Sequence, residues 1–194
     1  MQSFIEQAVA YLSNSSKNAP SPPSVVEELV KAEKIAKQDK VRYSYPQLQG
    51  NWRLGFITGT KKSQKKAGIV LGAGRFLPRW VEIQISYLPS PDDLERGQVY
   101  NCVQLGFLKI TLDGPVLFYS KMNLLAFDFI HMKLTLSKLK LYEGNIRGNG
   151  DENIFYEQSI KQQAFFNYFL VKDNYIAARG KGGGLALWTR VTNV

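Results

Sequence analysis

FFNYFLVKDNYIAARGKGGGLALWTRV, the stretch from Phe165 to Val191, decides the fold class of this chain. Its apolar-rich strands are separated by a turn at Lys172-Asp173-Asn174 and by a glycine-rich hairpin from Gly180 to Gly184, with no helix between them. That succession is typical of the end of an antiparallel sheet. The segment Leu48–Leu54 (LQGNWRL) places a Gly-x-Trp at the start of the β region. Together these stretches predict a sheet that closes on itself, and a closed barrel provides an interior for a ligand.

The β region begins after Tyr45-Pro46, where the apolar period changes from 3.6 residues to 2. Trp52, Leu54 and Phe56 are expected on one strand face. We predict eight or nine β segments in all, because closure removes the unpaired edges that make apolar strands aggregate. Besides the strands of Gln163–Val191, the predicted segments are Trp52–Ile57, Ala67–Leu71, Trp80–Leu88, Val99–Leu112, a turn at Asp113-Gly114-Pro115, Val116–Lys121, Leu124–His131 and Met132–Tyr142, with a bulge or break near Ser137.

Two short helices are predicted before the sheet. Apolar residues recur at helical spacing from Ser3 to about Leu12, and a second helix is expected from Val25 to about Lys37. Ser24 and Glu27 have the spacing of a capping box at its start. We therefore divide the chain into a helical region over 1–45 and a barrel over 46–194, within a single structural domain. The helices are expected to pack against the barrel or plug one end; insertion of the first into a membrane surface is the alternative.

Composition restricts the possible partners of the chain. Its 194 residues contain 25 Lys and Arg against 16 Asp and Glu, a formal charge of +9 that favours an anionic partner. The single cysteine, Cys102, allows no intrachain disulfide, and one cysteine with one histidine does not make a metal site. No run of 18 apolar residues occurs, so a membrane-spanning helix is not expected. The first residues lack the features of a leader, which is either absent or already removed.

A lysine cluster interrupts the β region between Thr58 and Ala67. Its members are Lys61, Lys62, Lys65 and Lys66. A solvated loop is the simplest interpretation, and contact with a peripheral anionic membrane surface is the sharper one. Nucleic acid is not expected as a partner, because neither interleaved aromatic residues nor a recognition helix accompanies the cluster.

Aromatic residues make up 12% of the chain, and many fall on alternating strand faces. A barrel of about eight strands either fills its interior with such side chains or leaves room for one elongated apolar ligand. Periodicity does not separate a filled core from a cavity. The candidate cavity-lining residues are Phe56, Phe107, Phe118, Phe127, Phe129 and Phe169. Trp52 is expected to be covered by Arg179 or Arg190 in a cation–π contact that closes the barrel and has no chemical role.

Catalytic patterns are weak in this sequence. The one histidine, His131, shares a predicted strand face with Phe127 and Phe129, whereas Asp128 lies on the opposite face, so the two side chains should diverge. Gly180–Gly184 could cradle a phosphate, but a strand rather than a helix follows it, so a hairpin connection is the better interpretation. We expect no catalytic residue and no metal site.

Two segments carry a resemblance to a known family. Leu48–Leu54 is similar to the opening Leu-x-Gly-x-Trp of the plastid lipid-associated proteins, also called fibrillins or plastoglobulins, and Asn174–Gly183 resembles their closing segment. The helical region before Gly-x-Trp also fits that family. The chain departs from it at Lys181, where the family commonly has Asp, and in being basic where many members are acidic.

The resemblance implies a mainly β, lipocalin-like antiparallel barrel, in a cyanobacterial or plastid protein. It implies non-catalytic binding or storage of a hydrophobic ligand, and the only cofactor expected is a bound lipid, isoprenoid quinone or carotenoid. The location implied is peripheral to a thylakoid or lipid globule, on the cytoplasmic or stromal side. A scaffold whose barrel is filled is one alternative. An enzyme acting on an isoprenoid or pigment, with Asp128 or His131 as acid or base, is another.

Overall fold

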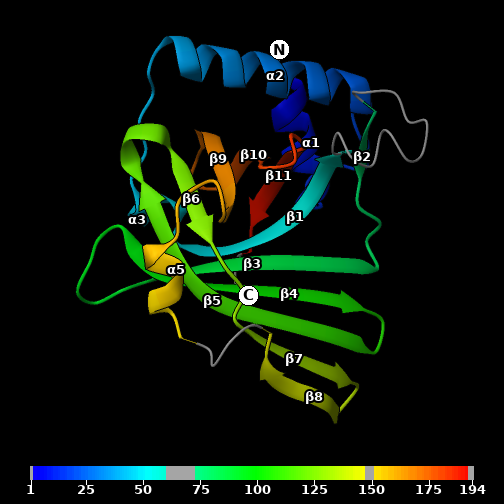
Figure 1. Cartoon of the computed structure of the whole chain (residues 1–194). Coiled ribbons are helices and arrows are strands. Elements are labelled where there is room, and N and C mark those ends of the chain that lie inside the picture. Colours follow the sequence, from blue (N-terminus) through cyan, green and yellow to red (C-terminus); the bar gives the residue numbers. More distant parts are fainter. Residues whose placement is uncertain (1, 60–72, 147–150, 192–194) are drawn as a thin grey trace.

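The computed structural model describes residues 2–59, 73–146 and 151–191, and within them eight antiparallel strands close into a barrel (Figure 1). Hydrogen-bonded neighbours run in the order β4-β3-β1-β11-β10-β9-β6-β5, and β5 pairs with β4 to complete the ring. The predicted closed antiparallel barrel is therefore confirmed. Its strands are β1 (Gly50–Thr58), β3 (Val81–Pro89), β4 (Arg96–Leu105), β5 (Leu108–Tyr119), β6 (Leu124–Phe127), β9 (Ala164–Val171), β10 (Tyr175–Gly180) and β11 (Leu185–Arg190).

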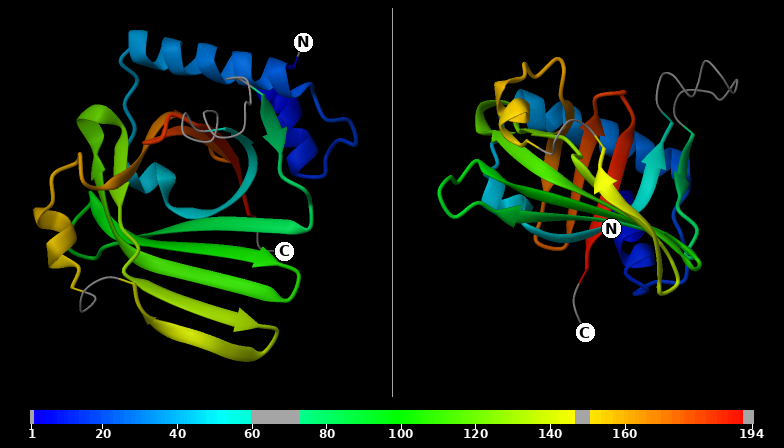
Figure 2. Two further views of the ribbon diagram at one scale, coloured as in Figure 1. Left: turned by 45° about the vertical axis from the view of Figure 1, so that its right-hand side comes forward. Right: turned by 60° about the horizontal axis from the view of Figure 1, so that its bottom comes forward.

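Three further strands extend the sheet beyond the ring. The short β2 (Gly74–Phe76) pairs with β1, and β7 (His131–Leu136) pairs with the first half of β5. β8 (Leu139–Asn145) pairs with β7 through a hairpin in which Ser137 adopts φ 55°, so the predicted break near Ser137 is confirmed. Figure 2 shows the ring of strands nearly end-on in its left view, with β7 and β8 continuing the sheet past β5. We use the name sheet extension for β7 and β8 together with the three ring strands whose sheet they continue, β3, β4 and β5.

Four helices accompany these strands within the described ranges. They are α1 (Phe4–Leu12), α2 (Pro22–Gln38), α3 (Tyr45–Leu48) and α5 (Asn153–Glu157). The two predicted N-terminal helices are confirmed, but the second begins earlier than expected. Its N-cap is Ser21, whose hydroxyl accepts from the Ser24 amide, and the fixed φ of Pro22 and Pro23 suits the first turn. Helices α3 and α5 were not predicted from the sequence.

The predicted turn at Asp113-Gly114-Pro115 is wrong, because β5 passes straight through it. The β4–β5 connection lies earlier, at Gly106-Phe107, where Gly106 adopts φ 58°. Gly114 serves a different purpose, since a Cβ there would lie 2.2 Å from the Asp128 carbonyl oxygen. Glycine thus lets the chain between β6 and β7 pass close to β5. The predicted strand over Ala67–Leu71 lies outside the described residues.

The helices divide the buried residues between the inside and the outside of the barrel. Figure 1 shows α2 lying across the top of the barrel, above β9, β10 and β11. The apolar faces of α1 and α2 pack there against outward side chains that include Phe56, Phe169 and Leu187. α5 covers another outer patch through Phe155, next to Leu124 and Ala126 of β6. By contrast, α3 contributes Tyr45 and Leu48 to the inner cluster and closes one end of the ring.

Candidate functional site

The end of the barrel at α3 is filled with side chains. Trp52 is fully buried, and its indole Nε1 donates to the Leu48 carbonyl at 2.7 Å. The Arg190 guanidinium carbon lies 4.1 Å from the centroid of the Trp52 ring, within the range of a cation–π contact. Arg190 also donates to the Asp173 carbonyl, so it joins the last strand, the preceding turn and the Gly-x-Trp segment. This arrangement closes the barrel at the Gly-x-Trp segment.

Arg179, the other predicted partner of Trp52, takes a different role. Its guanidinium donates to both carboxylate oxygens of Glu33 on α2 and, at 2.6 Å, to the Gly183 carbonyl. The hydrogen bond to Glu33 raises the Arg179 pKa. Arg179 therefore fastens α2 and the Gly180–Gly184 hairpin to the barrel. That hairpin is confirmed as a tight connection, with the Gly180 amide donating to the Gly184 carbonyl at 2.9 Å.

Buried phenols occupy the interior beside this end. The hydroxyls of Tyr87 and Tyr168 are 2.7 Å apart, and both side chains are fully buried. Burial raises the pKa of each phenol, and in Tyr87 the neighbouring Tyr168 adds to the effect. The Tyr45 hydroxyl donates to the Leu88 carbonyl at 2.8 Å. The aromatic side chains at this end thus form a packed core whose polar atoms bond to one another and to the backbone.

The structure divides the six candidate cavity-lining phenylalanines into three groups. Phe118, Phe127 and Phe129 belong to or pack against the inner cluster, as expected of inward residues. Phe56 and Phe169 instead lie beneath the helices on the outside of the barrel. Phe107 is 79% exposed in the β4–β5 turn. The expectation that Phe56, Phe107 and Phe169 line an interior is therefore wrong.

A β-bulge explains the position of Phe56 but not that of Phe169. Along β1 the partner of Leu54 is Trp188 and that of Phe56 is Leu187, so Gly55 is an extra residue. In β9, by contrast, Phe166 and Tyr168 face the inner cluster, so Phe169 faces outward by ordinary alternation. The bulge there, between the pairs Tyr168–Ala178 and Leu170–Ala177, changes the faces only of the residues after Phe169. An extra residue reverses the alternation of faces beyond it. The period-2 pattern in the sequence carries no sign of such a shift.

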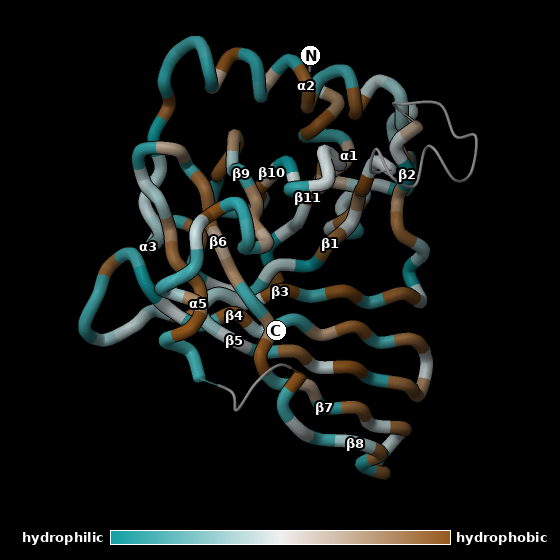
Figure 3. Tube along the Cα trace, in the orientation of Figure 1, coloured by the Kyte–Doolittle hydropathy of each residue, from teal (hydrophilic) through white to brown (hydrophobic). Residues whose placement is uncertain are grey.

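The sheet extension has one apolar face, the candidate site of this protein. The strand pairings align its residues in three rows that cross β3, β4, β5, β7 and β8. From the tip inward, the rows are Val81-Leu105-Leu108-Leu136-Leu139, then Ile83-Val103-Ile110-Leu134-Tyr142, then Ile85-Asn101-Leu112-Met132-Gly144. We call these positions the apolar sheet face. Figure 3 shows the underlying alternation of hydrophobic and hydrophilic residues along β3, β4 and β5.

The apolar sheet face continues the barrel core and becomes exposed toward its tip. The next row toward α3 contains Tyr87 and Val99, which are fully buried in the inner cluster. At the tip, Leu105 is 41% exposed, Leu136 45% and Leu139 64%. Asn101 brings the one amide to this surface, and its Oδ1 atom is buried without a hydrogen-bond partner in the described structure. A half-covered apolar surface with an unsatisfied amide can receive a mostly apolar molecule.

The opposite face of the same sheet is polar. Apart from Cys102, the residues that alternate with the apolar sheet face are polar or charged: Glu82, Gln84, Gln104, Lys109, Thr111, Asp113, His131, Lys133, Thr135, Lys140 and Glu143. His131 Nδ1 lies 3.1 Å from Asp113 Oδ1 there, and Glu143 accepts from Lys140 Nζ at 2.9 Å. The hydrogen bond to Lys140 lowers the Glu143 pKa. His131 therefore lies on the solvent side of the sheet, while Asp128 Oδ1 accepts from the Phe129 amide.

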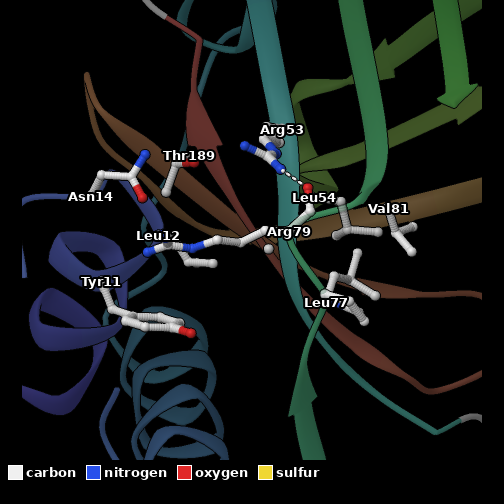
Figure 4. Close-up of a pocket in the computed structure, with 11 residues that line it drawn as sticks. Tyr11, Leu12, Asn14, Arg53, Leu54, Leu77, Arg79, Val81 and Thr189 are labelled. Carbon is white, nitrogen blue, oxygen red and sulfur yellow. Dashed lines mark hydrogen bonds between the residues drawn. The ribbon is translucent and has the colours of Figure 1, made fainter. Parts of the chain in front are cut away.

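A small pocket lies between α1 and the barrel rim, close to the tip of the extension (Figure 4). Its volume is about 130 Å³. Arg53, Arg79 and Thr189 contribute polar groups from the barrel side, and Tyr11 and Asn14 from α1 and the turn after it. This pocket could not be predicted from the sequence, because its residues come from segments far apart in the chain.

The structure does not test the predicted membrane contact of the lysine cluster. Lys61, Lys62, Lys65 and Lys66 lie outside the described ranges. No group of three or more His, Cys, Asp or Glu side chains in those ranges could hold a metal ion. No helix in the same ranges is long and apolar enough to cross a bilayer.

Comparisons with known proteins identify no family. No family model matches the sequence, and no curated protein matches it. A solved structure described as a redesigned β-barrel resembles this chain with 10% sequence identity and a TM-score of 0.36. The match covers 76% of this chain and 94% of that one.

Proposed function

We propose that this protein binds a hydrophobic ligand without catalysis, on the apolar sheet face at the end of the barrel away from α3. The observation that carries the proposal is the continuity of that face, which runs from the buried barrel core to leucines that are 41% to 64% exposed at the tip. We further propose that the chain is a plastid lipid-associated protein. Its ligand would then be a lipid, quinone or carotenoid, bound beside a photosynthetic membrane or a lipid globule.

The hydrophobic effect provides the free energy for such binding. Each square ångström of apolar surface that leaves water contributes roughly 25 cal/mol, before the cost of immobilising the ligand. The apolar sheet face offers a long surface for an elongated molecule, because its three rows of apolar side chains lie side by side. The Asn101 amide offers one acceptor and two donors to a polar group on that molecule. This combination favours a mostly apolar ligand with a single polar substituent near the barrel core.

A second candidate is a scaffold that uses the same face to bind a protein partner. The observation that favours it is the filled interior at the α3 end, where Trp52, Tyr87 and Tyr168 are fully buried. Both candidates require the apolar sheet face, but only the first requires affinity for a small apolar molecule.

The test is binding of the neutral fluorescent probe Nile red to matched variants of neighbouring residues. Leu134 belongs to the apolar sheet face and Thr135 follows it on the polar face. Leu134→Gln should raise the Kd roughly five- to tenfold, because about 1 kcal/mol of apolar contact is lost. Thr135→Gln should leave the Kd within about twofold of the parent value.

Two results would contradict the ligand proposal. Equal weakening by both variants would show that the probe does not use the apolar sheet face. Failure of the parent protein to bind the probe would favour the scaffold. Circular dichroism of each variant shows whether the fold is retained.

A further inference from the structure

Two arginines, Arg53 and Arg79, meet at the pocket between α1 and the barrel rim. The groups that they contact there, a carbonyl oxygen and an aromatic ring, carry no negative charge. Arg53 Nη2 donates to the Arg79 carbonyl oxygen at 3.1 Å, which holds the two residues together (Figure 4). The Arg79 side chain extends across the pocket, with its guanidinium carbon 5.8 Å from the centroid of the Tyr11 ring. Neither guanidinium forms a salt bridge with a carboxylate within the described part of the chain.

The remaining lining suits an anion with several oxygen atoms. Thr189, a buried polar residue with a hydroxyl group, and Asn14, which has a side-chain amide, also line the pocket. Guanidinium groups donate in a planar fork that matches the oxygens of a phosphate, and a positive charge near an aromatic face is held in place by the ring. The volume of about 130 Å³ accommodates a phosphate group but not a long chain.

The pocket adjoins the apolar sheet face. Val81 lines the pocket and also begins the tip row of that face, where it pairs with Leu105. Leu54 lines the pocket too and packs against the inner cluster. A group held by the arginines would therefore lie at the β3 end of the tip row, one strand away from Leu105, which is 41% exposed.

We propose that this pocket binds a phosphate group, and that the apolar sheet face holds the hydrocarbon part of the molecule that carries it. The inference rests on the proposed function and extends it from a hydrophobic ligand to an anionic amphiphile. Arg53 and Arg79 bind the phosphate oxygens, Thr189 and Asn14 complete the site, and Val81 forms its junction with the apolar rows.

The test compares hexadecyl phosphate with hexadecanol, which has the same chain without the charge. Affinities are measured by displacement of Nile red and by titration calorimetry. The parent protein should bind hexadecyl phosphate more tightly. Arg53→Gln and Arg79→Gln should each weaken that binding roughly tenfold or more and leave hexadecanol affinity within about twofold, because charge-assisted hydrogen bonds are lost only with the phosphate. Arg75→Gln, which removes a charge from an exposed position on β2, is the matched control.

Inorganic phosphate distinguishes a free anion from a headgroup. If it binds with the same dependence on Arg53 and Arg79 and with similar affinity, the site takes free phosphate and the hydrocarbon part of the proposal is overturned. Equal affinity for hexadecyl phosphate and hexadecanol in all variants would overturn the anion site and leave the proposed function intact. Arg79→Lys provides a folded comparison if Arg53→Gln loosens the rim, and it should retain more phosphate affinity than Arg79→Gln.

Discussion

The two ends of strand β5 use the same alternation of side chains for different purposes. Near α3, Phe118 faces the barrel interior and is fully buried among Tyr45 and the inner cluster. On the same face of the same strand, Ile110 lies in the sheet extension and is only half-buried. At the first end α3 and the opposite wall of the barrel cover the apolar side chains. At the second end the strands diverge from the ring, and the face they carry stays partly open to solvent.

This difference means that one end of the sheet contributes mainly to folding stability and the other mainly to ligand binding. Side chains that are already out of water contribute to folding, whereas apolar surface that remains exposed is available to a ligand. The α3 end should therefore tolerate substitution poorly, and the sheet extension should tolerate it well while losing affinity.

The largest effect is expected from Phe118→Ala at the α3 end. Removing a fully buried ring leaves a cavity, and such changes typically cost about 3–5 kcal/mol of unfolding free energy. Urea denaturation followed by circular dichroism measures the change. A loss below about 1 kcal/mol would show that this end is loosely packed and would remove the contrast with the extension.

The second-largest effect is expected from alkaline pH, which should lower the free energy of unfolding through the Tyr87–Tyr168 pair. Burial raises both phenol pKa values above the ordinary 10.0, so these groups stay neutral in the folded protein while unfolded tyrosines ionise. Stability is therefore complete below pH 10 and falls as the pH rises above it, by up to about 1.4 kcal/mol per pH unit for each tyrosine.

Urea denaturation at increasing pH measures this slope. The double substitution Tyr87→Phe and Tyr168→Phe should flatten it, although the variant loses one buried hydrogen bond at neutral pH. Tyr142→Phe in the sheet extension is the control, since Tyr142 is 44% exposed, and its profile should follow that of the parent. An unchanged slope in the double variant would place the alkaline sensitivity elsewhere.

The smallest effect on stability is expected from Ile110→Ala in the sheet extension. Because the side chain is half-buried, the loss of unfolding free energy should be about 1 kcal/mol, well below that of Phe118→Ala. Nile red affinity should nevertheless fall severalfold. If stability falls as far as in Phe118→Ala, the extension is part of the core and its open face is not a separate binding surface.

Much of the barrel could be predicted from the sequence because its signals are local. The strand periodicity, the turn at Lys172-Asp173-Asn174 and the hairpin at Gly180–Gly184 depend on neighbouring residues. A contact between Trp52 and either Arg179 or Arg190 was also expected, and the structure shows that Arg190 makes it. The turn predicted at Asp113-Gly114-Pro115 is wrong because Gly114 is not a turn residue. Glycine is needed there because the backbone of Asp128 passes close to it.

The candidate site was less predictable than the barrel. The alternation of Val81, Ile83 and Ile85 was visible in the sequence, but its alignment with β4, β5, β7 and β8 depends on pairing register. Phe56 was assigned to the interior because a bulge leaves no mark in a periodic pattern. Phe169 was assigned there because alternation alone does not say which of the two strand faces is enclosed.

The sequence by itself determined that the chain forms an antiparallel barrel with two helices ahead of it, since periodicity, caps and turns act over a few residues. Only the tertiary structure decided which apolar side chains are enclosed and which remain open. That outcome depends on the β-bulges and on the point along β5 where its neighbour changes from β7 to β6. It also depends on which part of the barrel each helix covers. The meeting of Arg53 and Arg79 beside Tyr11 has the same origin, because the chain must fold before α1 and the barrel rim can form a pocket.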